Sequence, residues 1–268
     1  MPAANNAMDG EQRRAVCALL YQHWLDGTQF EGLPPDLRPA DRAEAYQVQS
    51  YIEERSARPL TGWKIAATST AGQAHIGVDG PLAGRLLAER GIPDGGSCAL
   101  GNNLMRVAEA EFAFRMGQDL PPRAEPYSRD EVLACVSALH PAIELPDSRY
   151  QHFERVGALQ LIADNACAHY YVLGAAAPES WRTLDLAAYK VRGFRNGTLA
   201  ESGQGANVLG DPRLALTWLA NELSRFGFTL AKDQFVMTGT CIKPMVITRG
   251  DGVEADFGQL GKVSVAVT

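Results

Sequence analysis

The chain has 268 residues, of which 46% are hydrophobic and 21% are charged, and its formal net charge is −6. This composition predicts a globular protein with a real core, built as one large domain or two smaller ones. The mild charge, without a dense Lys/Arg patch in the sequence, argues against nucleic acid as a main partner. Five widely spaced cysteines without a Cys-x-x-Cys motif favour a reducing compartment over a disulfide framework or a zinc site. The polar first residues and the lack of a long apolar run predict a soluble, cytoplasmic protein with no membrane contact.

Two amphipathic helices are predicted at the start of the chain. Asp9 is the expected N-cap of the first, which runs to about Leu25. The second is expected to begin at residues 39–41. Together they predict a helical N-terminal region, 1–58, followed by a mixed β catalytic region, 59–268. No linker separates the two regions, so one compact unit is expected.

A buried strand is predicted at residues 61–68, where Lys64 is the only charge among apolar neighbours. A lysine in such a strand has two ordinary explanations, a salt bridge or a side chain that reaches back to water. A short helix is predicted at residues 69–76. Residues 82–90 are expected to form a loop or a helix over it.

The stretch 106–115 alternates at period 2 and predicts a second strand, with Glu109 and Glu111 on the same face. Two neighbouring carboxylates repel each other, and a hard divalent cation such as Mg²⁺ would remove that cost. The ordinary alternative is an edge strand with a solvated acidic face.

A capping-box pattern at Ser128 predicts a helix that runs to about Leu139. Residues 140–146 then predict a strand whose only charge is Glu144. A lone glutamate among apolar neighbours needs a partner, and Arg149 is the ordinary candidate.

The C-terminal half is predicted to be mostly β. Asn196-Gly197 predicts a hairpin with a type I′ turn, and Asp211-Pro212 predicts the start of a helix that ends near Phe226. Further strands follow between Gln234 and Val267. The histidines are few and scattered, which argues against a histidine metal site or a catalytic triad.

Three strand-borne glutamates and one strand-buried lysine form a coherent set. Three carboxylates suit an octahedral Mg²⁺ or Mn²⁺, which can chelate a 2-oxo acid and act as a Lewis acid. A lysine beside such an ion, with its pKa lowered by the metal and by burial, can hold the substrate carboxylate or move protons.

Several motifs follow one another in a fixed order: Gly62-Trp63-Lys64-Ile65-Ala66, Gly77-Val78-Asp79-Gly80-Pro81, Glu109-Ala110-Glu111-Phe112, Ala142-Ile143-Glu144-Leu145-Pro146-Asp147-Ser148-Arg149, Ala163-Asp164-Asn165-Ala166, Thr238-Gly239-Thr240 and Asp256-Phe257-Gly258-Gln259-Leu260-Gly261. In this order they resemble the 2-keto-4-pentenoate hydratase group of the fumarylacetoacetate hydrolase superfamily, which also holds the 4-oxalocrotonate decarboxylases. The resemblance extends from about Pro59 to the last residue and, more weakly, over the two N-terminal helices.

The resemblance implies an α/β fold of the α+β type, with mixed β-sheets rolled around a metal site, helices outside, and a homo-oligomer. It implies Mg²⁺ or Mn²⁺ held by Glu109, Glu111 and Glu144, with Lys64 as the catalytic residue. A small 2-oxo acid is the implied substrate. The positions implied to bind it are Leu82, Asn165, Cys167 and Thr240.

Two positions depart from the hydratase pattern, which often has an acidic residue at Leu82 and a serine at Cys167. Both are expected near the far end of the substrate, where water would be activated. The prediction is a metal-dependent lyase of aromatic catabolism, a hydro-lyase that converts a 2-hydroxypenta-2,4-dienoate-type substrate into a 4-hydroxy-2-oxo acid. The alternative is a carboxy-lyase that decarboxylates a 2-oxo-hexenedioate. Further alternatives are C–C hydrolysis of an acylpyruvate and a non-catalytic metal-binding scaffold.

Overall fold

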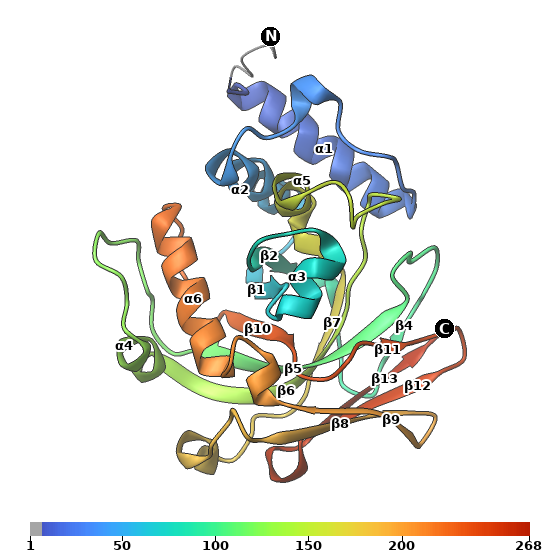
Figure 1. Cartoon of the computed structure of the whole chain (residues 1–268), viewed down its shortest axis with the longest axis vertical. Helices are drawn as coiled ribbons and strands as arrows, with labels where there is room; N and C mark the ends of the chain where they lie inside the picture. The colour runs from blue at the N-terminus through green and yellow to red at the C-terminus, as the bar shows by residue number, and fades with distance from the viewer. Residues whose placement is uncertain (1–6) are drawn as a thin grey trace.

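The structure, a computed structural model, describes residues 7–268, so the first six residues of the polar start lie outside it. The helices of this range are α1 (Gly10–Asp26), α2 (Arg42–Ser50), α3 (Thr70–Ile76), α4 (Arg129–Ala134), α5 (Ala158–Ala163) and α6 (Pro212–Arg225). Asp9 caps α1 by accepting the Gln12 N–H, and Gly27 ends the helix in the left-handed region, where glycine is favoured. Both predicted N-terminal helices are confirmed. They pack with α5 at one end of the molecule (Figure 1).

Most strands belong to a mixed sheet in the order β2-β1-β10-β5-β6-β7-β3, with β11 added beside β5. Its members are β1 (Leu60–Ala66), β2 (Leu82–Leu87), β3 (Gly91–Ile92), β5 (Val107–Met116), β6 (Val136–Leu145), β7 (Tyr170–Leu173), β10 (Phe235–Thr240) and β11 (Met245–Val246). A smaller sheet has the order β4-β13-β12-β8-β9. It consists of β4 (Ser97–Cys98), β8 (Lys190–Arg195), β9 (Thr198–Gln204), β12 (Gly252–Asp256) and β13 (Lys262–Val267). The predicted hairpin is confirmed, because Asn196 and Gly197 both have positive φ between β8 and β9.

The larger sheet curls back on itself. Its two outermost strands, β2 and β3, are separated in the chain only by the turn at residues 88–90. A flat sheet of seven strands would be roughly 29 Å wide, too far for so short a link. Across the inside of the curl, Thr61 Oγ1 lies 2.7 Å from Tyr171 Oη, which joins β1 to β7. The mixed, rolled sheet expected from the resemblance is therefore confirmed.

Two predicted elements are wrong. Residues 82–87 form strand β2, antiparallel to β1, rather than a loop or a helix. All six are buried, so the stretch has no polar alternation that would reveal a strand. The helix predicted from Ser128 does have its capping box, but it ends at Ala134. Residues 136–139 instead begin β6, because they pair with β5 across the sheet.

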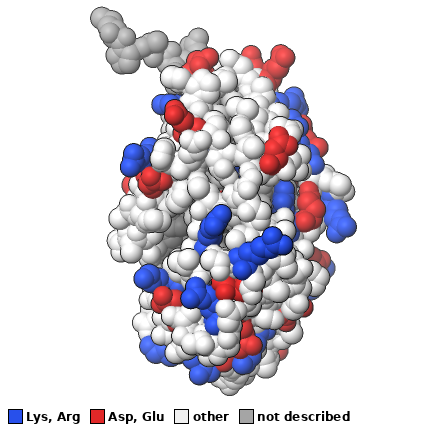
Figure 2. Space-filling view, turned by 90° about the vertical axis from the view of Figure 1, so that its right-hand side faces the viewer, with Lys and Arg blue, Asp and Glu red and all other residues white. Residues whose placement is uncertain are grey.

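Buried side chains of α1 and α2 belong to the same apolar cluster as those of the sheets, and the division of the chain at residue 58 stays a prediction. Positive and negative side chains are interspersed over the face shown in Figure 2, in keeping with the mild net charge. Within residues 7–268, no helix combines the length and the apolar character needed to cross a bilayer.

Candidate metal and substrate site

Three glutamates meet on the inner face of the curled sheet. Glu109 and Glu111 lie on β5, and Glu144 of β6 is the direct cross-strand partner of Glu109. Because side chains alternate along a strand, this register puts all three carboxylates on one face. Each offers a carboxylate oxygen, and these oxygens lie within 4.8 Å of one another. Glu111 and Glu144 are fully buried and Glu109 is partly exposed, so the cluster is most open to solvent at Glu109.

Lys64 points into the same cluster from β1. Its Nζ lies 3.1 Å from Glu144 Oε1, and it donates a hydrogen bond of 3.0 Å to the carbonyl oxygen of Ala166. The side chain is 3% exposed, so it does not reach back to water. The suggestion that Glu144 pairs with Arg149 is wrong, because Arg149 is bound to Asp164 instead. The salt bridge that was one explanation for Lys64 therefore exists, and its partner is a glutamate of the cluster.

The glutamates keep oxygen atoms free. Glu111 Oε2 accepts the N–H of Gly239 at 2.7 Å, and Glu144 Oε1 forms the ion pair with Lys64, but among the described residues Glu111 Oε1 and Glu144 Oε2 have no hydrogen-bond partner. Buried polar atoms are normally satisfied. Three carboxylates and one ammonium also leave two negative charges, which one divalent cation matches. The donor set is the all-oxygen type that Mg²⁺, Mn²⁺ and Ca²⁺ take, so the residues present fit such an ion.

The pKa values report the same imbalance. Burial and the neighbouring Glu144 raise the pKa of Glu109 to about 7, with Lys64 opposing the shift. Burial and the charges of Glu144 and Glu109 raise the pKa of Glu111 well above its usual value, and burial raises that of Glu144. Burial alone would lower the pKa of Lys64, but the charges of Glu144 and Glu109 overcome this and raise it. The lowered lysine pKa was expected beside a bound metal ion, and for that case it stays a prediction.

A β-bulge shapes the site on the β10 side. The register between β10 and β5 shifts between Met237 and Thr240. Gly239, inside the bulge, has a φ of +102°, and a Cβ there would lie 2.2 Å from Thr68 Oγ1. Only glycine fits this position, and the resulting kink aims the Gly239 N–H at Glu111.

The four positions expected to bind substrate are held in different ways, and substrate contact by each stays a prediction. Leu82 is fully buried in β2, opposite Ala66. Thr240 donates its hydroxyl to the carbonyl of Ile242 at 2.8 Å. The Asn165 amide is bound to the main chain of β2, and burial raises the pKa of the Cys167 thiol to about 12.

Main-chain groups contribute contacts that the sequence did not reveal. The carbonyl of Ala166 holds Lys64, and the N–H of Gly239 holds Glu111. No side-chain pattern encodes a carbonyl or an N–H that is aimed at a site. The only available signal was the position of both residues within the family motifs.

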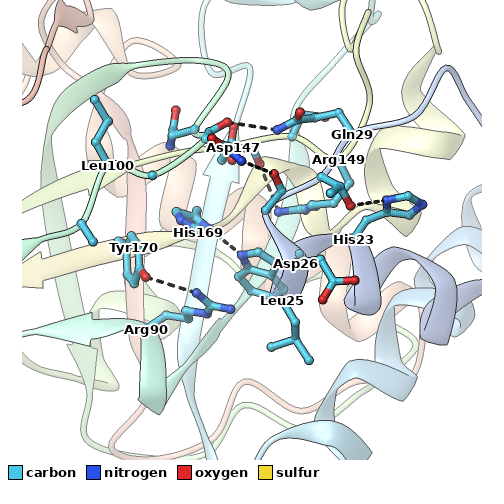
Figure 3. Close-up of a pocket in the computed structure, with 18 residues that line it drawn as sticks. His23, Leu25, Asp26, Gln29, Arg90, Leu100, Asp147, Arg149, His169 and Tyr170 are labelled. Atoms are coloured by element: carbon cyan, nitrogen blue, oxygen red, sulfur yellow. Dashed lines mark hydrogen bonds between the residues drawn. The ribbon is translucent and has the colours of Figure 1, made fainter.

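A separate cavity of about 310 Å³ lies between α1, the loop at residues 99–103 and the start of β7. Arg90 and Tyr170 lie on one side of it and Gln29 and Arg149 on the other (Figure 3). Neither Lys64 nor the three glutamates are among the described residues that line it. The chemistry that the glutamates and the lysine can support is therefore not located in this cavity.

Comparison with known proteins places the chain in a family. Residues 95–268 match the fumarylacetoacetate (FAA) hydrolase C-terminal family. The chain is 33% identical to 2-keto-4-pentenoate hydratase 1 of Dechloromonas aromatica, over 93% of this chain and 95% of the relative. It is 29% identical to a 4-oxalocrotonate decarboxylase of Pseudomonas putida, over 97% of this chain and 98% of the relative.

Among solved structures, the fold matches 4-oxalocrotonate decarboxylase from Pseudomonas putida G7, which was determined in complex with magnesium and adipate. The TM-score is 0.89 at 28% sequence identity, and the match covers 98% of this chain and 100% of that chain. The family match and the full-length relatives show that this chain belongs to the fumarylacetoacetate hydrolase family, in its group of 2-keto-4-pentenoate hydratases and 4-oxalocrotonate decarboxylases.

Proposed function

We propose that this chain is a divalent-metal-dependent lyase acting on small 2-oxo acids of the 2-hydroxydienoate type. The carrying observation is the convergence of Glu109, Glu111 and Glu144, with unpartnered buried oxygens, beside the ion-paired Lys64. The hydratases and decarboxylases among its full-length relatives support the same class of reaction. A purely structural scaffold would have no use for a buried ammonium beside a carboxylate cluster with free oxygens.

The three glutamates are the proposed ligands of the cation, for which Mg²⁺ and Mn²⁺ are the candidates; the magnesium in the related decarboxylase favours Mg²⁺. When bound, such an ion supplies Lewis-acid stabilisation of negative charge on the carboxylate and 2-oxo oxygens of a substrate. We further propose a homo-oligomer in the cytoplasm, on the family resemblance.

Lys64 is the proposed proton-handling residue. Its ammonium has three N–H groups; one is given to Ala166 and one faces Glu144, which leaves one for the substrate. In hydration, a proton leaves the 2-hydroxyl group and another is delivered to the far carbon, which gives the unsaturated ketone to which water adds. The Lys64 ammonium can give a proton from Nζ to the far carbon and then take up the proton that leaves the 2-hydroxyl group. Glu144 keeps the ammonium in place while it does so.

Decarboxylation is the second candidate, and the far end of the site favours it. In decarboxylation the C–C bond to the distal carboxylate breaks and CO₂ leaves. The electron pair of that bond passes into the dienolate, so no base has to activate water. Leu82 and Cys167 are the two positions expected near that end. Leu82 is apolar and fully buried, and the Cys167 thiol, with a pKa raised to about 12 by burial, stays protonated at neutral pH.

Turnover of a small panel separates these reactions. Purified protein with Mg²⁺ is mixed with 2-hydroxypenta-2,4-dienoate, with 2-oxo-hex-3-enedioate and with an acylpyruvate, and the loss of ultraviolet absorbance and the products are followed. A hydratase gives the 4-hydroxy-2-oxo acid from the first, and a decarboxylase gives CO₂ from the second. The lyase proposal fails if only the acylpyruvate is consumed, or if no compound is consumed with and without Mg²⁺.

A further inference from the structure

Three consecutive residues next to Lys64 adopt the left-handed conformation. Asn165, Ala166 and Cys167 have φ values of +56°, +49° and +60°. L-amino acids adopt this region rarely, and a run of three persists only where the surroundings hold it in place. The contacts of this turn therefore show which groups stabilise it and which neighbour it positions.

The Asn165 side chain anchors the turn to strand β2. Its Oδ1 accepts the N–H of Arg85 at 2.6 Å, and its Nδ2 donates to the carbonyl of Arg85 at 2.9 Å. Among residues 7–268, strand β2 pairs with β1 alone, so within this range its other edge has no strand beside it. The amide of Asn165 takes the place of that missing strand at one residue, and it is 1% exposed. Both polar atoms of the amide thus bond to the main chain of Arg85.

The anchored turn packs directly against Lys64. Gly84 is the cross-strand partner of Lys64, and a Cβ at Gly84 would lie 2.3 Å from the carbonyl oxygen of Asn165 and 3.1 Å from Lys64 Cδ. No side chain fits between the turn and the lysine stem at this point. The Ala166 carbonyl oxygen accepts a hydrogen bond from Lys64 Nζ at 3.0 Å.

A second buried amide braces the same segment from the N-terminal helices. Gln49 of α2 donates from Nε2 to the carbonyls of Ala83 and Ile162, each at 2.8 Å. These carbonyls belong to β2 and to α5, which leads into the turn. The lysine, the turn and the strand edge are thus fixed relative to one another by side-chain amides.

We propose that Asn165 is a positioning residue for Lys64. It holds the turn in place, and the Ala166 carbonyl of this turn accepts a hydrogen bond from the Lys64 ammonium and so fixes its position. For the part of Lys64 in turnover, this inference rests on the proposed function. Without the anchor, Glu144 is the remaining partner of the ammonium among the described residues, so Nζ moves toward the carboxylates and away from its working position.

The test uses Asn165→Gly, because glycine adopts the left-handed conformation readily and lacks the side chain that carries the amide. The matched control is Asn221→Ala in α6, since Asn221 makes the same pair of bonds to the main chain of Tyr127, at 2.7 Å and 3.0 Å. The first readout needs neither metal nor substrate: the ¹⁵Nζ–¹H NMR signal of Lys64, assigned by its loss in Lys64→Met. The signal is expected in the wild type and in Asn221→Ala, and lost to solvent exchange in Asn165→Gly. An unchanged signal in Asn165→Gly, or no signal in the wild type, overturns the inference.

The second readout is a double-mutant cycle on turnover. Asn165→Gly should lower kcat on the order of 10- to 10²-fold, the loss that a misplacement of about 1 Å can cause, with KM nearly unchanged. In the Lys64→Met background it should have no further effect, whereas additive losses would contradict a role through Lys64. If Asn165→Gly does not fold, Asn165→Asp keeps the shape of the side chain and an acceptor for the Arg85 N–H but loses the donor, and it is put through the same cycle. If the wild type turns over no 2-oxo acid, the proposed function fails while the NMR result still decides the positioning role.

Discussion

Glu109 and Glu144 are direct partners across the antiparallel pair β5–β6, so two carboxylates face each other on the inner surface of the curled sheet. Glu111 follows on the same face, and the ammonium of Lys64 compensates only one of the three charges. Buried like charges at such spacing are unfavourable in the protein alone. The arrangement becomes favourable when a cation occupies the space between the carboxylates.

Replacing Glu111 with glutamine should separate metal binding from folding. Glu111→Gln keeps the side-chain volume and an acceptor for Gly239, and it removes one repelling charge. The metal-free protein should melt at the same or a higher temperature. Its Mg²⁺ affinity in calorimetry should fall by at least the roughly 10- to 100-fold that loss of an outer-shell partner causes.

Glu44→Gln is the control, because Glu44 is buried and accepts main-chain N–H groups elsewhere. The Mg²⁺ affinity of this variant should not change. A Glu111→Gln protein that is less stable but binds Mg²⁺ normally would refute the ligand role.

Mg²⁺ binding should release protons near neutral pH. The pKa of Glu109 is raised to about 7, and those of Glu111 and Glu144 are raised too, all through burial in the first place. Below about pH 7 a proton must therefore leave before the cation binds, so the apparent affinity should fall as the pH decreases through 7. Calorimetry in two buffers of different ionisation enthalpy measures the protons released. More protons should be released at pH 6.5 than at pH 8.5, and equal release at both values would contradict the raised pKa values.

His169 should make the fold sensitive to acid. Burial and the nearby Arg90 and Arg149 lower its pKa from 6.5 to about 3, and Trp24 donates its indole N–H to His169 Nδ1, which requires a neutral ring. The unfolded chain therefore binds a proton below pH 6.5 that the folded protein excludes. The contribution to stability is complete above pH 6.5 and is lost between about pH 6.5 and 3, at up to about 1.4 kcal/mol per pH unit.

Urea unfolding at several pH values between 4.5 and 7.5 checks this prediction. His169→Gln should unfold with a flatter pH dependence than the wild type over this range, although it is less stable at pH 7.5. His152→Gln, at an exposed position, should leave the slope as it is. Parallel slopes for the wild type and His169→Gln would exclude His169 as the titrating group.

Lys64→Met should remove turnover and spare the metal. Methionine keeps the bulk of the side chain and removes both the charge and the proton. Turnover should fall on the order of 10²- to 10⁴-fold, the usual range for a general acid–base group. Mg²⁺ affinity should hold or rise, because a repelling cation has gone. The control is Lys190→Met, because Lys190 is exposed at the start of β8. Near-normal turnover by Lys64→Met would make Lys64 a structural cation.

Much of the fold was readable from local patterns. The caps at Asp9 and Asp211 and the Asn196-Gly197 turn act within a few residues, so the sequence alone predicts them. The alternation of Glu109 and Glu111 on one face is likewise a property of a single strand. Glu144 was found because an ionised group in an apolar strand requires a partner.

The remaining features depend on contacts between distant segments. Strand β2 is buried on both faces, so its six residues carry no alternation, and only its pairing with β1 makes it a strand. The predicted partner of Glu144 was wrong because Arg149, five residues away, is bound to Asp164. The actual partner, Lys64, lies on another strand. The left-handed turn at residues 165–167 contains no glycine, so the sequence does not indicate its conformation. Its conformation follows from the edge of β2, which the chain reaches eighty residues earlier.

The central claim is that the three glutamates hold a divalent cation beside Lys64, and Mn²⁺-soaked crystals test it most directly through anomalous scattering. We expect one strong anomalous peak between the carboxylates of Glu109, Glu111 and Glu144, which weakens or disappears in Glu111→Gln crystals. An anomalous peak elsewhere, with the glutamates bound only to one another and to Lys64, would contradict it.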